Sequence, residues 1–171
     1  MTYTLLCPFG FRSQKILIAA KIANVSITHP SFQMGKDNKT KEFTEKNPFN
    51  KVPVLDTCHG PIYESNAILR FIARHSPISG LYGNSDYEKS LIDQWLDCVS
   101  GELEVVRGVW LYTVLGGLPY NAKAHSEAKK ECLEVLKKLD AHFLHTTYIA
   151  KGQTITIADL ALFCALVDWV Y

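Results

Sequence analysis

Two patterns of apolar and polar positions divide the chain. In the first 75 residues, short stretches of β-forming or alternating residues are interspersed with stretches in which apolar residues recur every three to four positions. The first pattern is typical of strands and the second of helices. The turn-rich residues 56–60 lie between two strand patterns and predict a hairpin. We expect a βαβ, α, ββ, α order, with strands near residues 3–6, 25–29, 52–55 and 61–63 and helices near 13–23, 41–46 and 65–75.

Only helical spacing is found in the second half of the chain. Proline, glycine and serine at residues 76–83 indicate a linker. Helical patterns then cover residues 92–106 and 128–143 and begin again at residue 156. The sequence therefore predicts a small α/β domain at 1–76, a linker at 77–84 and an all-helical domain at 85–171. Because the last apolar pattern is still running at Tyr171, we expect the helical domain to be incomplete.

The start of the third helical pattern carries a capping signal. Thr156 can accept hydrogen bonds from free N–H groups of the first turn, and Asp159, three residues later, can reach back to Thr156. We therefore expect a reciprocal cap at this helix start.

Composition and charge indicate which classes of binding partner are unfavourable for this protein. Hydrophobic residues make up 47% of the chain and charged residues 20%, which is typical of a folded globular protein. Eighteen basic and seventeen acidic side chains leave a net charge of +1, which disfavours nucleic acid and membrane surfaces as main partners. The longest apolar run, residues 160–167, is far shorter than the ~20 residues that span a bilayer.

Cysteine and histidine positions bear on compartment and metal binding. His142 and His145 share a helical face without an acidic or cysteine partner, so we expect no metal site. The cysteines are odd in number and widely spaced, which indicates reduced thiols rather than a disulfide framework. Since the N-terminus also has no basic, apolar leader, the sequence predicts a cytoplasmic protein. The five cysteines are Cys7, Cys58, Cys98, Cys132 and Cys164.

Two residue pairs are candidates for ligand binding. Val52-Pro53, at the start of a predicted strand, suits either a cis peptide bond or a trans bond at a strand edge. Glu64-Ser65 stands where a strand is followed by a helix. Ser65 can cap that helix, or the free N–H groups there can receive a carboxylate ligand. The residues alone leave both alternatives open.

Cys7 is the candidate nucleophile. It follows the first strand and precedes the first helix, where the helix dipole favours a thiolate and Arg12 can add to the effect. Gly10 stands where the second cysteine of a dithiol motif would be, so dithiol redox chemistry of that type is excluded. Ser13 and Tyr3 are weaker candidates. The alternative interpretation of Cys7 is a small buried residue at a strand end.

Three motifs in this order resemble the glutathione transferase superfamily: residues 47–55, 63–68 and 156–160. The resemblance spans essentially the whole chain. It implies a thioredoxin-like N-terminal domain followed by an all-helical glutathione-transferase C-terminal domain. Residues 17–20, 35–43 and 113–116 are also similar to the transferase-like N-terminal domains of the gamma subunits of translation elongation factor 1.

The resemblance implies a glutathione site. In the superfamily the bond corresponding to Val52-Pro53 is cis, and the backbone of the residue before the proline pairs with the thiol peptide. Glu64 and Ser65 match the residues that hold the γ-glutamyl end of glutathione. Lys51, next to Val52, belongs to the same matched motif, so Lys51, Val52, Pro53, Glu64 and Ser65 are the expected glutathione-binding residues.

Two functional hypotheses follow from the resemblance. In the first, the chain is a scaffolding module that anchors the guanine-nucleotide exchange subunit (beta or delta type) of elongation factor 1. It keeps a site for glutathione as ligand or cosubstrate and needs no other cofactor. The alternative is an active glutathione transferase or thioltransferase that uses Cys7, since this cysteine resembles that of the omega class, which forms mixed disulfides with glutathione. The resemblance also implies a homodimer through residues 65–75 and the helix around Trp95.

Overall fold

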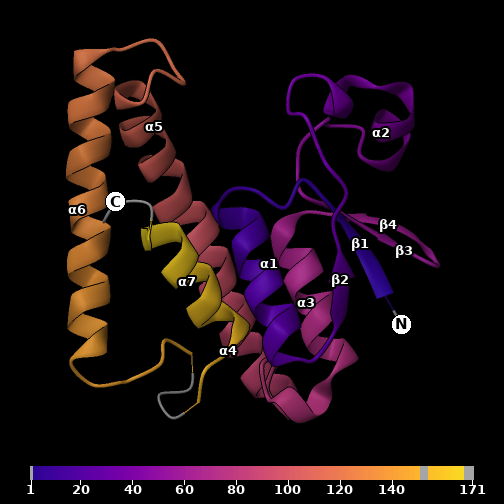
Figure 1. Cartoon of the computed structure of the whole chain (residues 1–171). Helices are drawn as coiled ribbons and strands as arrows, with labels where there is room; N and C mark the ends of the chain where they lie inside the picture. The colour runs from indigo at the N-terminus through magenta and orange to yellow at the C-terminus, as the bar shows by residue number, and fades with distance from the viewer. Residues whose placement is uncertain (1, 151–153, 168–171) are drawn as a thin grey trace.

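The computed structural model describes residues 2–150 and 154–167, and it shows two parts packed against each other (Figure 1). The first part consists of a four-stranded sheet and its helices, in the predicted order. A short 3-10 helix, η1 (Asp37–Lys39), precedes the second helix. The main elements are β1 (Thr2–Leu6), α1 (Phe11–Ile22), β2 (Ser26–Thr28), α2 (Lys41–Lys46), β3 (Val54–Thr57), β4 (Gly60–Tyr63) and α3 (Ser65–His75).

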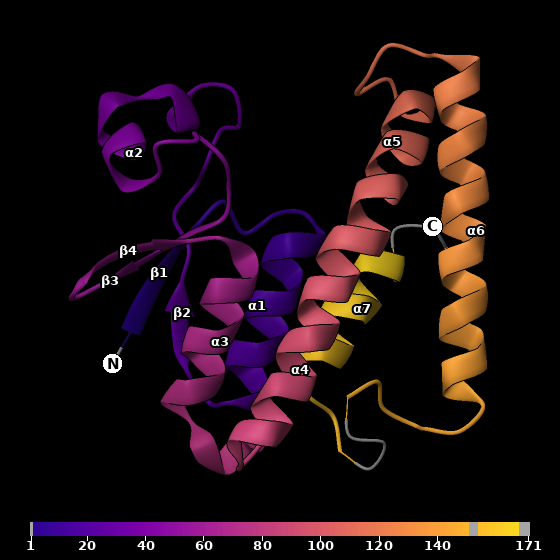
Figure 2. The ribbon, with the colours of Figure 1, turned by 180° about the vertical axis from the view of Figure 1, so that it is seen from behind.

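The sheet has the strand order β2-β1-β3-β4. β1 runs parallel to β2, which requires the crossover through α1, and antiparallel to β3. β3 and β4 form the predicted hairpin. α1 and α3 lie together on one face of the sheet, between the sheet and the helical part (Figure 2). The predicted thioredoxin-like N-terminal fold is confirmed.

Every element of the second part within its described residues is a helix, and turns connect these helices. α7 packs against α1 and α4, whereas α5 and α6 pair with each other and extend away from the sheet (Figure 1). No helix within the described ranges is long and apolar enough to cross a membrane. The expectation that the helical domain is incomplete depends on the apolar pattern at residues 168–171, and these lie outside the described residues. The elements are η2 (Pro77–Ser79), α4 (Asp86–Cys98), η3 (Val99–Glu104), α5 (Val105–Val114), α6 (Ala122–Phe143) and α7 (Ile157–Val167).

The helix predicted around residues 92–106 contains a π-helical stretch. The backbone is helical from Asp86 to Val114, but η3 (Val99–Glu104) is a π-helix between two α-helices. A π-helical turn adds a residue to the helical ladder, changes which side chains face the neighbouring part, and is frequent at functional sites. Apolar spacing of three to four residues does not distinguish α from π turns, so the sequence predicted one uniform helix.

One hydrophobic core joins the two parts. Buried side chains of β1, β3, α1 and α3 form a single cluster with buried side chains of α4, η3 and α7. Because this packing is continuous, the relative position of the two parts is held by the core itself. The fully buried members include Leu5, Ile16, Leu55, Ile68, Ile72, Ile92, Leu96, Ile157 and Ala161.

The start of α7 carries only half of the predicted cap. Asp159 does reach back, because its Oδ2 accepts from the backbone N–H of Thr156 at 2.7 Å. The prediction that Thr156 caps free N–H groups is wrong, since its hydroxyl donates to the same Oδ2 at 2.7 Å. A hydroxyl close to a carboxylate makes a stronger, charge-assisted bond by donating to it. The other carboxylate oxygen accepts from the N–H of Ile149 at 2.7 Å, which ties the preceding loop to the helix.

Candidate functional site

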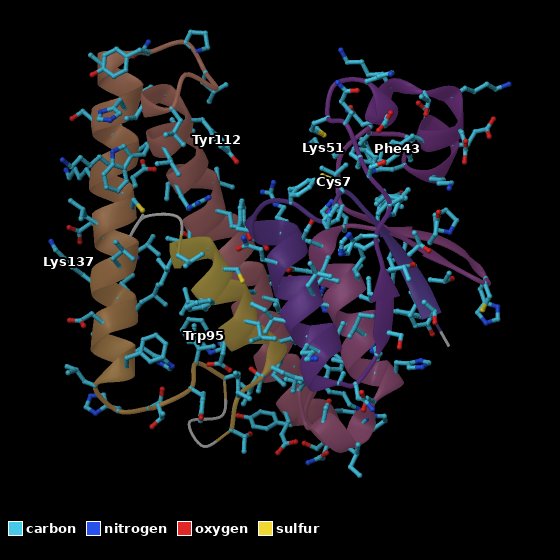
Figure 3. The ribbon with its side chains drawn as sticks, viewed as in Figure 1. Cys7, Phe43, Lys51, Trp95, Tyr112 and Lys137 are labelled. Carbon is cyan, nitrogen blue, oxygen red and sulfur yellow. The ribbon has the colours of Figure 1, made fainter. Side chains whose placement is uncertain are left out.

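A pocket of about 210 Å³ lies where the sheet part meets the helical part. Its residues come from α1, from the loop before β3, from the start of α3 and from η3. Figure 3 shows Lys51 in the loop before β3, on the side turned toward α5 and α6. The structure thus brings together all five predicted glutathione-binding residues. The lining residues are Arg12, Asn47, Lys51, Val52, Pro53, Glu64, Ser65, Asn66, Ser100 and Glu104.

The loop before β3 presents its backbone to the pocket in a fixed geometry. The Val52-Pro53 peptide bond is cis, as the resemblance implied. Buried Asn47 holds the loop, because its amide donates to the carbonyl of Lys51 at 2.6 Å and its Oδ1 accepts from the N–H of Phe49 at 3.1 Å. These bonds satisfy loop groups within the chain and leave the loop ordered beside the pocket.

The N-terminus of α3 is open toward a ligand. Glu64 occupies the N-cap position with a φ of 70°, and no side chain in the described part of the chain caps this helix. Ser65 is the first helical residue and is 8% exposed, so the interpretation of Ser65 as a helix cap is wrong. Because the first N–H groups of a helix carry a partial positive charge, this end of α3 favours an anionic group.

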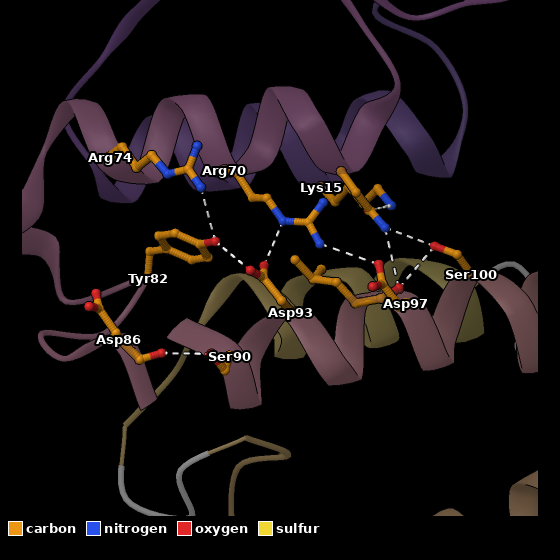
Figure 4. A network of polar contacts seen from close by, with 11 residues as sticks. Lys15, Arg70, Arg74, Tyr82, Asp86, Ser90, Asp93, Asp97 and Ser100 are labelled. Carbon is orange, nitrogen blue, oxygen red and sulfur yellow. Dashed lines mark hydrogen bonds and ion pairs between the residues drawn. The ribbon is translucent and has the colours of Figure 1, made fainter. Parts of the chain in front are cut away.

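A polar cluster at the wall of the pocket links α1, α3 and η3, and Figure 4 shows its members Lys15 and Ser100. Lys15 is fully buried, donates to Asn66 Oδ1 at 2.7 Å and lies 3.5 Å from Glu104 Oε1. The amide of Asn66 donates to Ser100 Oγ at 2.8 Å. Arg12 completes the cluster by donating to Glu104 Oε2 from Nη2 at 2.9 Å and from Nε at 3.2 Å. The cluster therefore joins the two parts through charged and polar contacts beside the apolar core.

Two cations share one carboxylate in this cluster. Burial is the largest effect on Lys15 and lowers the pKa of its ammonium group, because desolvation disfavours the charged form. Glu104 opposes that shift, and the neighbouring Arg12 adds to it. The Glu104 side chain is 5% exposed, so its charge is balanced by these two residues rather than by solvent.

Apart from Arg12, which was expected to assist Cys7, the sequence did not identify the members of this cluster as site residues. Ser100 and Glu104 are four residues apart, and they lie beside the buried Val99 and Leu103. This pair of polar residues at helical spacing, next to an apolar helix face, is the sequence signal from which the two site residues could have been found. Lys15, between the helical positions of α1, gave no signal of this kind, because a single lysine in a helix is most often exposed.

A second polar network fastens α3 to α4 outside the pocket (Figure 4). Arg70 donates to Asp93 at 2.6 Å and to Asp97 at 3.3 Å. Tyr82 donates to Asp93 at 2.7 Å and accepts from Arg74 at 3.1 Å. This network stabilises the helix pair that carries Asn66 and Ser100 at its pocket end.

Cys7 is placed close to the pocket loop but does not line the pocket. Leu6 pairs with Val54 in the sheet, so Cys7 follows directly at the end of β1 opposite the Val52-Pro53 loop. Its side chain is 5% exposed, and its carbonyl accepts from the hydroxyl of Ser13 at 2.7 Å. The guanidinium of Arg12, expected to assist Cys7, is bonded to Glu104 instead. The role of Cys7 as nucleophile stays a prediction.

Across residues 2–150 and 154–167, no three His, Cys, Asp or Glu side chains come together as a metal-ligand set. His142, one of the two histidines considered above, is packed against Trp95 with ring centroids 4.6 Å apart. Its Nε2 lies 2.9 Å from the carbonyl oxygen of Ile149. The ring of His142 is therefore part of the contact between α4 and α6.

Comparison with known families bears on the first part of the chain. Residues 2–74 match the family model described as the N-terminal domain of glutathione S-transferase. This part of the chain belongs to the glutathione transferase superfamily. The resemblance predicted from the three motifs is confirmed.

Curated relatives extend the similarity into the helical part. The chain is 39% identical to "Elongation factor 1-gamma 1" of Oryza sativa subsp. japonica over 153 residues, which are 89% of this chain and 36% of that protein. It is 36% identical to "Elongation factor 1-gamma" of Artemia salina over 161 residues, or 93% of this chain and 36% of that protein. The chain spans about 36–40% of the length of the curated relatives that it matches.

Solved structures of glutathione transferases share the whole fold. A mutant of poplar glutathione transferase F1 superimposes with a TM-score of 0.88 at 21% identity, covering 96% of this chain and 79% of that one. A delta-class glutathione transferase of Nilaparvata lugens gives a TM-score of 0.86 at 25% identity, covering 99% of this chain and 80% of that one. The predicted fold, a thioredoxin-like domain followed by a helical transferase domain, is thus confirmed.

Proposed function

We propose that this chain is the transferase-like module of an elongation factor 1 gamma subunit and that its pocket binds glutathione. The first half of the proposal is supported by similarity to curated elongation factor 1-gamma proteins over 89–97% of the chain. The second half rests on one observation, the convergence of Lys51, Val52, Pro53, Glu64 and Ser65 on one pocket.

The pocket offers a complementary group for each part of a thiol tripeptide. Ser65 and the N–H groups at the start of α3 suit the α-carboxylate of the γ-glutamyl residue, and the Glu64 carboxylate suits its ammonium group. The backbone of Val52 pairs with the cysteinyl residue, and the ammonium group of Lys51 binds the glycyl carboxylate. This arrangement places charged ligand ends on opposite charges of the chain.

The test of the glutathione site is calorimetry with a double variant. Glu64→Ala combined with Ser65→Ala removes two polar contacts to charged groups of the ligand, each worth about 1.5–3 kcal/mol. The affinity for glutathione should therefore fall by at least about a hundredfold. Glu134→Ala, on the outer side of α6 where Glu134 pairs with Lys137, is the control and should bind as the wild type does. Equal affinities for wild type and double variant would refute the site.

The proposed role in the elongation factor 1 complex is to anchor the exchange subunit of beta or delta type in the cytoplasm. We also propose a homodimer through α3 and α4, the two helices fastened by Arg70 and Asp93. Sedimentation of the chain and a pull-down with the exchange subunit test both statements. A chain that stays monomeric at micromolar concentration and does not retain the exchange subunit contradicts this role.

The second candidate function is catalysis, as a glutathione transferase or a thioltransferase that uses Cys7. Its support is the position of Cys7 between β1 and α1, next to the Val52-Pro53 loop. In thiol transfer, the Cys7 thiolate attacks the glutathione sulfur of a mixed disulfide, forms a disulfide with glutathione and releases the other half as a thiolate. Cys7→Ser should abolish this exchange while binding of the exchange subunit is retained.

A further inference from the structure

A groove of about 460 Å³ runs along the helical part, where α5 and α6 lie side by side (Figure 2). Its floor contains Val106 of α5 and Val135 of α6, which are both half-buried and packed against the hydrophobic core. The groove shares no lining residue with the pocket proposed for glutathione. It is therefore a separate concave surface with apolar side chains at its base.

Charged side chains of predominantly one sign surround this apolar floor. Three carboxylates of α6 stand at positions i, i+4 and i+7 and so lie along one face of that helix, and a fourth comes from η3. Two lysines of α6 also line the groove, so four carboxylates stand against two ammonium groups. The carboxylates are Glu102, Glu127, Glu131 and Glu134, and the ammonium groups are those of Lys130 and Lys138.

Glu102 and Glu131 are available to bind a cation from outside the chain. Both are exposed, they come from different helices, and neither has an ion-pair partner among the residues that the structure describes. The other two carboxylates each pair with a lysine of α6. These pairs are Glu127 with Lys123 at 4.0 Å and Glu134 with Lys137 at 2.8 Å.

We propose that this groove is a docking surface for a basic amphipathic helix of a partner protein. The apolar face of such a helix contacts Val106 and Val135, and lysine or arginine residues beside that face pair with Glu102 and Glu131. Charge complementarity selects a basic segment over an acidic one, and the apolar floor selects an amphipathic segment over a small cation. The part of α6 that lines the groove, residues 127–138, is about 16 Å long, which matches about three turns of a docked helix.

This inference goes beyond the proposed function and does not depend on it. The groove belongs to η3, α5 and α6, so it shares no residue with the α3–α4 contact proposed for the homodimer. Glutathione binding and docking of a basic helix can therefore be measured and refuted separately.

The test is fluorescence anisotropy with a labelled peptide of about fourteen leucines and lysines, whose leucines share one helical face. The full chain should bind this peptide and should not bind a peptide in which glutamate replaces every lysine. A third peptide has the composition of the first, but its leucines are spread around the helix. It should bind more weakly, because it presents no apolar face to Val106 and Val135.

Glu102→Gln combined with Glu131→Gln removes both available carboxylates. Because exposed ion pairs contribute modestly to binding, the Kd of the leucine–lysine peptide should rise by about two- to thirtyfold. Glu42→Gln combined with Glu45→Gln is the matched control. It changes the net charge equally, on α2 and outside the groove, and should keep the Kd of the wild type. All four glutamates are exposed, and thermal denaturation checks that both double variants fold.

Cys98 reports where the peptide binds. It stands four residues before Glu102; burial raises the pKa of its thiol, Glu102 adds to this shift and Lys138 opposes it, which places the thiol near two residues of the groove. Bound peptide should therefore slow the alkylation of Cys98 by iodoacetamide, as read by mass spectrometry. Exposed Cys58 in the β3–β4 hairpin is the control within the same molecule and should react at an unchanged rate.

Three results overturn the inference. The first is a leucine–lysine peptide that does not bind, or that binds equally to the wild type and to the Glu102 and Glu131 double variant. The second is binding that leaves the alkylation of Cys98 unaffected. The third is a wild-type dimer in sedimentation that this double variant converts to a monomer, because a second copy of the chain would then occupy the groove.

Discussion

The carboxylate of Asp159 accepts three hydrogen bonds, and its removal should destabilise the whole chain. Asp159→Ala leaves the N–H of Ile149 and both the N–H and the hydroxyl of Thr156 without their acceptor. Ile149 is 1% exposed and Thr156 is fully buried, so water reaches these donors poorly. Each buried donor left unsatisfied costs about 1–3 kcal/mol, which gives an expected loss of about 3–9 kcal/mol for the three donors. That is a large fraction of the stability of an ordinary domain.

Urea denaturation followed by circular dichroism measures this loss. Asp159→Asn should lie between the wild type and Asp159→Ala, because the amide keeps one acceptor oxygen but turns an N–H₂ group toward a donor. Asp86→Ala is the matched control, since Asp86 also lies in the first turn of a helix, but its side chain is fully exposed and pairs with Lys89 at 3.5 Å. If Asp159→Ala loses no more stability than Asp86→Ala, the assignment of these three bonds is refuted.

Three further predictions concern buried charge and thiols. Lys15→Met leaves buried Glu104 with one cation and should lower the free energy of unfolding by about 3 kcal/mol in urea denaturation, whereas Lys137→Met on the surface of α6 should change it little. Burial raises the pKa of Cys132 to about 11, so the native state keeps a proton that the unfolded chain loses. The free energy of unfolding should therefore fall as pH rises from about 9 to 11, and Cys132→Ala should remove that part of the slope. In the native protein, iodoacetamide should alkylate exposed Cys58 before buried Cys7, as read by mass spectrometry; faster labelling of Cys7 would support its role as nucleophile.

The elements, their order and the resemblance to the superfamily could all be predicted from the sequence. Helix α2 has the predicted bounds, and α3 begins and ends at the predicted residues. These features depend on local patterns, because the periodicity of apolar residues decides which face of a segment is buried. The candidate binding residues at Val52-Pro53 and Glu64-Ser65 could also be predicted, because each pair is a short local motif next to a predicted strand or helix.

The contacts between polar side chains that are distant in the sequence could not be predicted and depend on the folded structure. Arg12 and Glu104 are 92 residues apart in the chain, and their contact exists because a π-helical stretch turns Glu104 toward α1. The hydroxyl of Thr156 donating to Asp159 was likewise not predicted, and the sequence left open whether Cys7 is a nucleophile or a small buried residue at a strand end. Local patterns report whether a position is buried, but the partner of a buried polar group depends on the packing of distant segments. That packing depends on all contacts of the core together, and no local segment determines it alone.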